Sequence, residues 1–150
     1  MASGSDNRPV LFAYDGSAPA KVAIEEAARQ LGPHRDGIVL TVWEPLAALP
    51  FPSPVNGAAD VEARMEHDAE RVAREGARIA RAAGFAATPL AEDGSPVWRS
   101  ILDVADAHDA GLVVVGSHGR SGLSQVLLGS VASTVARHSD RPVFIVHAGA

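Results

Sequence analysis

Short apolar runs alternate along the chain with longer stretches in which apolar residues recur at helical spacing. The runs cover residues 10–14, 38–43, 87–91, 112–115 and 143–146, and most are hydrophobic throughout, which is typical of strands covered on both faces. Four stretches between them predict helices: 18–31, 59–83, 96–105 and 130–139. Five strands that alternate with four helices predict an α/β three-layer sandwich with a parallel sheet in the order 3-2-1-4-5.

Residues that begin or end helices flank several of these stretches. Ser17 carries a side chain preferred at a helix N-cap, and Ser95, which precedes Pro96, predicts a second capped start. Gly84 predicts the end of the long helix. The charged side chains of this long helix, which include Glu62, Glu66 and Arg78, are expected to face solvent. Prolines from Pro45 to Pro54 exclude a regular helix or central strand, so a long loop is expected, either a lid or plain surface.

Length and composition narrow the class of protein. The 150 residues suit one domain, expected at 8–150 after a disordered tail at 1–7. The net charge of −5 argues against a nucleic-acid surface, and the absence of cysteine excludes thiolate chemistry. No apolar segment approaches the ~20 residues that span a bilayer. Without a visible targeting signal, a cytoplasmic protein that contacts neither membrane nor nucleic acid is expected.

A regular set of glycines follows the fourth apolar run. Gly116 comes directly after it, Gly119 follows after two intervening residues, and the pair Gly129-Ser130 lies at the start of the last predicted helix. Backbone amides ahead of a helix start form an anion-binding cradle. Gly116 would allow a sharp turn, Gly119 would let the backbone approach a phosphate, and Arg120 would add positive charge. The alternative is a glycine-rich loop that ends in an ordinary N-cap.

Asp15 ends the first apolar run, as Gly116 ends the fourth. In the predicted strand order both lie at the carboxyl edge of the sheet where the winding reverses, the usual place for a ligand. Asp15 could instead satisfy the amides of its own turn, and His118 could contact phosphate or simply face solvent. A Walker A loop is excluded because the chain's one lysine is Lys21.

The pattern Gly116-x2-Gly119-x9-Gly129-Ser130 resembles the nucleotide-binding signature of the universal stress protein family. Asp15-Gly16-Ser17 after the first strand, and the closing segment 141–146, are also similar to that family. The resemblance covers about residues 8–147 and favours the family's ATP-binding branch. It implies a Rossmann-like fold of the adenine nucleotide alpha hydrolase type.

The resemblance also implies a ligand and roles for individual residues. The ligand would be an adenine nucleotide, ATP with or without Mg²⁺. Asp15 would lie near the ribose or a bound Mg²⁺, Val42 would read adenine through its backbone, and Ala13 would lie under the nucleotide. The ribose and phosphates would be lined by Gly116, Gly119, Gly129, Ser130 and Val131. His118 and Arg120 complete the expected site.

Three functions are compatible with this site. The first is a cytoplasmic stress-response protein that binds ATP and acts on an unidentified protein partner as a nucleotide-dependent signalling module. The second is a slow ATPase that uses the same crevice, although the sequence contains no recognisable catalytic constellation. The third is a dimeric scaffold with a vestigial site. A homodimer through the apolar strand 143–146 is expected, because an unpaired apolar edge invites pairing.

Overall fold

Five parallel strands form one sheet in the computed structural model, which describes residues 6–50, 56–118 and 128–147. The strand order is β3-β2-β1-β4-β5, so both the predicted fold class and the predicted order are confirmed. The elements are β1 Val10–Ala13, α1 Ala18–Leu31, β2 Asp36–Trp43, the 3₁₀ turn η1 Leu46–Ala48, α2 Ala58–Ala82, β3 Ala86–Asp93, α3 Val97–Ala107, β4 Leu112–Gly116, α4 Ser130–His138 and β5 Val143–Val146.

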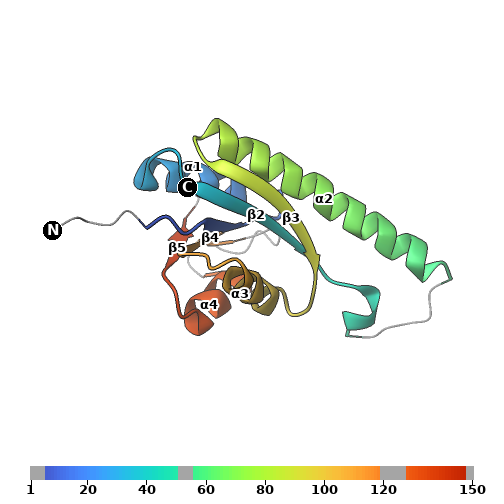
Figure 1. Ribbon diagram of the computed structural model, residues 1–150. Coiled ribbons are helices and arrows are strands. Elements are labelled where there is room, and N and C mark those ends of the chain that lie inside the picture. Colours follow the sequence, from blue (N-terminus) through green and yellow to red (C-terminus); the bar gives the residue numbers. More distant parts are fainter. Residues whose placement is uncertain (1–5, 51–55, 119–127, 148–150) are drawn as a thin grey trace.

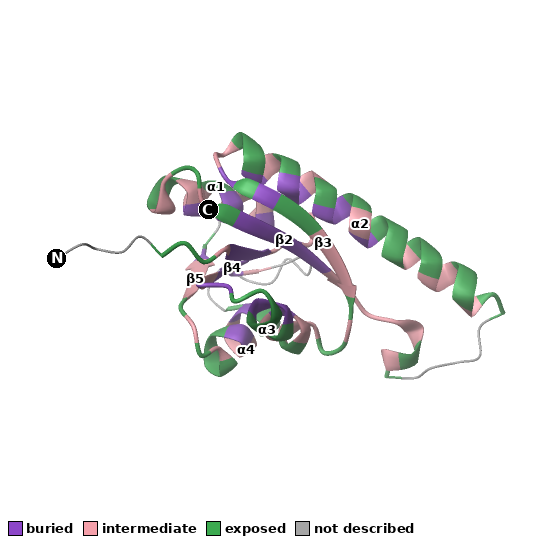
Figure 2. Ribbon diagram, in the orientation of Figure 1, coloured by how far each residue is buried: buried purple, intermediate pink, exposed green. Residues whose placement is uncertain are grey.

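The sheet is covered on both faces, which gives three layers (Figure 1). One apolar cluster joins it to α1 and α2, and a second joins the opposite face to α3 and α4. Burial is concentrated on the strands and on the helix faces turned toward them (Figure 2). Alternate residues of β1 enter the two clusters: Phe12 packs on the α1/α2 side and Leu11 on the α3/α4 side. This double burial explains why the central strands β1 and β4 are hydrophobic along almost their whole length.

The helix ends agree with the sequence at some positions and differ at others. Ser17 caps α1, since its Oγ accepts a hydrogen bond from the Ala20 amide at 3.3 Å. Gly84 follows the last turn of α2 with φ +111°, and its amide donates to the Arg81 carbonyl, as at other glycine-ended helices. The expected Ser95 cap is wrong: Pro96 occupies the N-cap of α3, and no side chain caps it.

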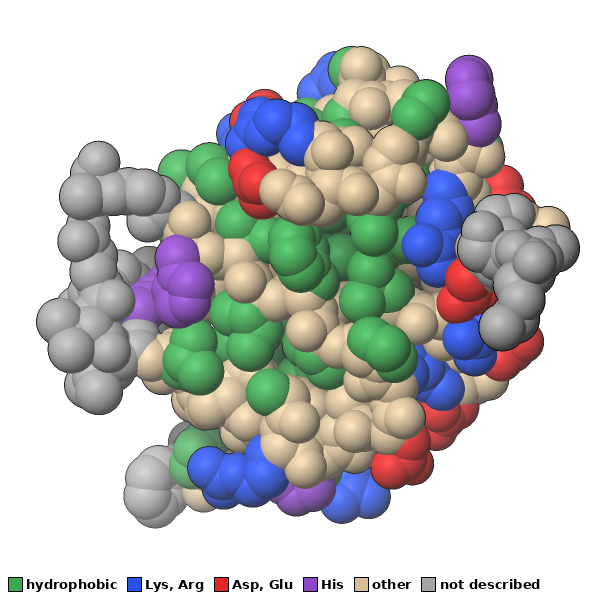
Figure 3. Space-filling view, turned by 90° about the vertical axis from the view of Figure 1, so that its left-hand side faces the viewer, with side chains coloured by type: hydrophobic (Ala, Val, Ile, Leu, Met, Phe, Trp, Pro, Cys, Tyr) green, Lys and Arg blue, Asp and Glu red, His purple; other side chains and the backbone are tan. Residues whose placement is uncertain are grey.

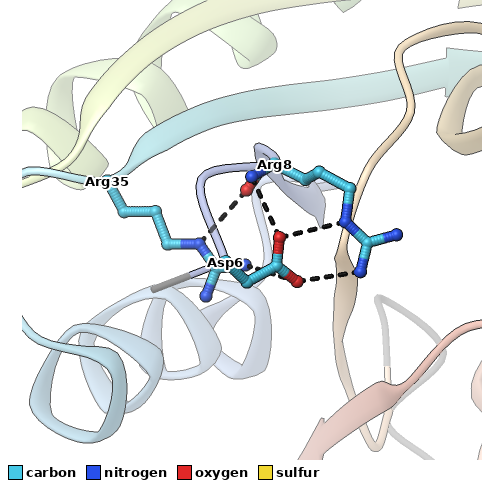
Figure 4. Close-up of polar contacts among 3 residues, drawn as sticks. All are labelled: Asp6, Arg8 and Arg35. Atoms are coloured by element: carbon cyan, nitrogen blue, oxygen red, sulfur yellow. Dashed lines mark hydrogen bonds and ion pairs between the residues drawn. The ribbon is translucent and has the colours of Figure 1, made fainter. Parts of the chain in front are cut away.

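The amino-terminal segment is bonded to the base of the sheet (Figure 4). Asp6 accepts two side-chain hydrogen bonds from Arg8, at 3.0 and 2.9 Å, and Arg35 lies 3.8 Å from the same carboxylate. The hydrogen bonds from Arg8 lower the pKa of Asp6 to about 2. Asp6 belongs to the segment 1–7 for which the sequence predicts a disordered tail, and residues 1–5 of that segment lie outside the described residues.

Helix α2 packs tightly against the sheet at Gly76. A Cβ at this position would lie 2.6 Å from both Tyr14 and Val39, so only glycine fits without movement. The surface charges of α2 mostly behave as expected, with Glu66 exposed and Glu70 paired with Arg74 at 3.8 Å. Glu62 differs, because its carboxylate accepts a hydrogen bond from a backbone amide of the segment after β2.

Candidate functional site

A pocket of about 310 Å³ opens at the carboxyl edge of the sheet, where β1 and β4 lie side by side. Eight of the ten residues predicted for the site line it, while Gly119 and Arg120 lie outside the described residues. The lining consists of Ala13, Tyr14, Asp15, Ala20, Leu40, Val42, Val97, Ile101, Val115, Gly116, Ser117, His118, Gly129, Ser130, Val131 and Ala132. The fold therefore brings these predicted residues together, and their role in binding stays a prediction.

One wall of the pocket is aliphatic. Leu40 and Val42 reach it from β2, and Val97 and Ile101 reach it from α3. Val97 and Ile101 are not among the site residues predicted from the sequence. Their helical spacing identified an apolar face of α3, but that spacing is the same whether a face covers the core or lines a pocket. Only the packing of α3 over β2 distinguishes the two.

The opposite end of the pocket is formed by backbone and by the start of α4. The Gly129 amide donates to the Ser117 carbonyl at 2.7 Å, and this bond joins the residue before α4 to the residue after β4. Gly129 is the N-cap of α4 and offers no side-chain cap, whereas Ser130 is the first helical residue and is exposed. The ordinary N-cap that the alternative interpretation of this loop expects is therefore Gly129, which has no side chain to cap the helix, and not Ser130. The positive end of the α4 dipole faces this end of the pocket.

Gly116 lies in a tight contact, and it is the last residue of strand β4 and not the sharp turn that was expected of it. The backbone angle φ of Gly116 is not positive, whereas that of Gly16, which does lie in a turn, is +82°. A Cβ on Gly116 would lie 3.2 Å from the Pro19 carbonyl oxygen. The missing side chain thus allows the end of β4 to approach the first turn of α1.

Asp15 lines the pocket and also stabilises its own turn. Its Oδ1 accepts a hydrogen bond from the Ser17 amide at 3.0 Å, so the turn role considered from the sequence is confirmed. Within the described ranges, no group of three or more histidine, aspartate or glutamate side chains is placed to hold a metal ion. A magnesium ion here would therefore take most of its oxygen ligands from water and from phosphate, as Mg²⁺ commonly does.

Tyr14 lies between the pocket and the α1/α2 layer. It is buried, and its hydroxyl donates to Glu75 on α2 at 2.8 Å. Burial, followed by this bond to a carboxylate, raises the pKa of Tyr14. The same bond, together with Lys21 at 3.1 Å, lowers the pKa of Glu75. Tyr14 therefore joins the end of β1 to two helices.

Comparisons with known proteins agree with the fold and with the family that the sequence resembles. The family model described as "Universal stress protein family" matches residues 6–147. A universal stress protein of Mycolicibacterium smegmatis is 32% identical over 158 residues, which cover 97% of this chain and 48% of that protein. The chain spans about half the length of this relative, and 44% of the length of the universal stress protein MT2698 of Mycobacterium tuberculosis, which it also matches.

Two solved structures illustrate the structural likeness. The hypothetical protein MJ0577 of Methanocaldococcus jannaschii has a TM-score of 0.78 at 21% identity, with 96% of this chain and 98% of that chain covered. A universal stress protein in complex with cAMP has a TM-score of 0.62 at 29% identity, with 94% and 97% covered. None of the helices in the described part of this chain is long and apolar enough to cross a membrane.

Proposed function

Because the chain belongs to the universal stress protein family, we propose that it is a cytoplasmic protein that binds ATP and uses nucleotide occupancy as a signal in a stress response. The observation that carries this proposal is the pocket at the carboxyl edge of β1 and β4, which has an aliphatic wall and the amino end of a helix opposite it. A nucleotide has two parts that match these features: a flat base that suits the aliphatic wall, and an anionic phosphate that suits the amino end of the helix.

The described residues fit such a ligand. A Cβ on Gly129 would lie 2.9 Å from the Ser117 carbonyl oxygen, which leaves no room for a side chain. Backbone atoms of Ser117 and Gly129 therefore line this end of the pocket. The relative solved with cAMP contains an adenine nucleotide, which supports the same ligand class here. Bound phosphates would bring negative charge and metal-binding oxygens to the site.

Each residue has a proposed part in binding. Val42 would contact adenine through its backbone, Ala13 would lie under the nucleotide, and Asp15 would face the ribose or a Mg²⁺ ion. The start of α4 would hold phosphate through its first amides. The remaining proposed contacts are Gly116, His118, Gly119, Arg120, Gly129, Ser130 and Val131.

Calorimetric titration of nucleotide-stripped protein with ATP, with and without Mg²⁺, tests the proposal. A micromolar dissociation constant, about −8 kcal/mol, is expected. Val131→Asp sharpens the test, because Val131 lines the pocket in the first turn of α4. An aspartate there is favourable for the helix but repels phosphate, so ATP affinity should fall by about tenfold or more. Adenosine affinity and the neutral Val131→Asn variant should change little, and equal ATP affinity in all three proteins would contradict the phosphate placement.

A homodimer through β5 is a second proposal, and it is independent of the ligand. Strand β5 is an edge strand whose apolar residues Val143, Phe144 and Ile145 are half-buried. Hydrophobic side chains gather on the face turned toward the viewer in Figure 3, which is the left-hand side of Figure 1. The opposite edge, β3, contains Pro89, which has no amide to donate. Light scattering at rising concentration should give a dimer that Ile145→Lys dissociates, and a wild-type monomer throughout would refute it.

A further inference from the structure

Two carboxylates of α2 are bonded to chain segments that adjoin the pocket. Glu75 accepts from the Tyr14 hydroxyl at 2.8 Å, and Tyr14 stands between the pocket-lining residues Ala13 and Asp15. Glu62 accepts from the Leu46 amide at 3.0 Å, four residues beyond pocket-lining Val42. One helix thus holds the carboxyl ends of both β1 and β2, although α2 itself contributes no residue to the described lining.

The tether at Tyr14 is tightly built. The Tyr14 amide donates to the Leu40 carbonyl at 2.8 Å, and its own carbonyl accepts from the Thr41 hydroxyl at 2.8 Å. The Tyr14 side chain lies in the apolar cluster on the face of the sheet covered by α1 and α2, and it packs against Gly76, where the missing side chain leaves room for it. A movement of α2 relative to the sheet would therefore move the end of β1 that carries Asp15.

The tether at Glu62 lies where α2 has left the core. The buried residues of α2 begin at Ala69, and its amino-terminal part extends past the sheet (Figure 1). Thirteen residues separate Glu62 from Glu75, about 20 Å along the helix. Among the described residues, the apolar neighbours of Glu62 on α2, Val61 and Met65, are only partly buried, and the bond from the Leu46 amide to Glu62 joins the segment after β2 to α2.

We propose that Glu62 and Glu75 are positioning residues of the pocket, and that α2 is a strut which holds the ends of β1 and β2 at the separation the ligand requires. This inference rests on the proposed nucleotide binding. The two residues act through Leu46 and Tyr14, without touching the ligand. By linkage, a ligand that prefers the tethered arrangement stabilises both tethers.

Affinity measurements on five variants test the strut. Glu62→Ala and Glu75→Ala remove the acceptors while placing the best helix former in α2, so loss of the helix cannot explain an effect. Each should weaken ATP binding about three- to tenfold, the loss expected for one hydrogen bond. Glu62→Gln and Glu75→Gln keep an acceptor oxygen and should restore most of the affinity. Glu66→Ala, exposed on the same helix and with the same charge change, should bind as wild type.

Hydrogen exchange supplies a measurement that needs no ligand. The Leu46 amide should be protected in wild type and in Glu66→Ala, and should exchange faster in Glu62→Ala. ATP should slow its exchange further in wild type. If wild type binds no ATP, the proposed function fails, and unchanged Leu46 exchange in Glu62→Ala overturns the tether separately. If wild type binds ATP, equal affinities for Glu62→Ala, Glu75→Ala and Glu66→Ala overturn the strut while leaving nucleotide binding intact.

Discussion

Gly129→Ala is the substitution for which the structure allows the most direct estimate. Gly129 has φ −59° and ψ 158°, a conformation open to every residue, so an alanine there introduces no backbone strain. The new Cβ would lie 2.9 Å from the Ser117 carbonyl oxygen, the acceptor of the Gly129 amide at 2.7 Å. The two backbones must separate, and the hydrogen bond between them weakens or breaks.

The cost has two parts. A lost backbone hydrogen bond costs about 1 kcal/mol, and forcing an extra methyl group into a close contact costs about 1–3 kcal/mol. Together they predict a loss of about 2–4 kcal/mol in the free energy of unfolding. For a chain of this length, 1 kcal/mol corresponds to roughly 2–4 °C, so the melting temperature should fall by roughly 4–16 °C.

Thermal and urea unfolding of Gly129→Ala beside Ser130→Ala measure this cost. Ser130 is exposed and does not cap α4, so its variant should stay within about 0.5 kcal/mol of wild type. A Gly129→Ala protein that unfolds at the wild-type temperature would refute the close contact. A large loss in Ser130→Ala would refute the assignment of the N-cap to Gly129. Calorimetry on both variants then separates stability from ATP affinity, which should fall in Gly129→Ala as the start of α4 shifts.

Three further predictions concern the elements around the pocket. Tyr14 is the chain's one tyrosine, so the ultraviolet tyrosinate signal should appear only well above pH 10 in the folded protein and near pH 10 in urea. Because its folded pKa is raised, its contribution to stability is complete below about pH 10 and is lost as the pH rises further; Tyr14→Phe should remove this alkaline loss. Gly76→Ala gains about 1 kcal/mol of helix propensity but places a Cβ 2.6 Å from Tyr14, so chemical unfolding should reveal a net loss. Ser17→Ala removes the α1 cap and should cost about 0.5–2 kcal/mol by the same assay.

The order of strands and helices could be predicted from the sequence because it depends on local periodicity. Continuous apolar runs such as residues 112–115 indicate strands buried on both faces, and the alternation with helices leaves few ways to wind the sheet. The glycine spacing after Gly116 and the acidic end of the first strand at Asp15 then indicated one crevice. Local pattern was therefore enough for the fold class and for the neighbourhood of the site.

The local pattern could not predict the role of each residue, because that role depends on which atoms of a distant element lie in contact with the residue. The sequence predicts a sharp turn at Gly116, whereas the approach of α1 at Pro19 is what makes a side chain there crowded. Glu62 was read as a solvated charge, whereas its partner is an amide 16 residues earlier in the chain.

The alternation of elements, the parallel three-layer fold and the edge of the sheet where the pocket opens could be predicted from the sequence. The wall formed by Val97 and Ile101, the cap at Gly129 and the two tethers of α2 are visible only in the folded chain. The physical reason is that periodicity records whether a face is buried. The contact that buries a face, or satisfies a polar group, is set by long-range packing that no single segment encodes.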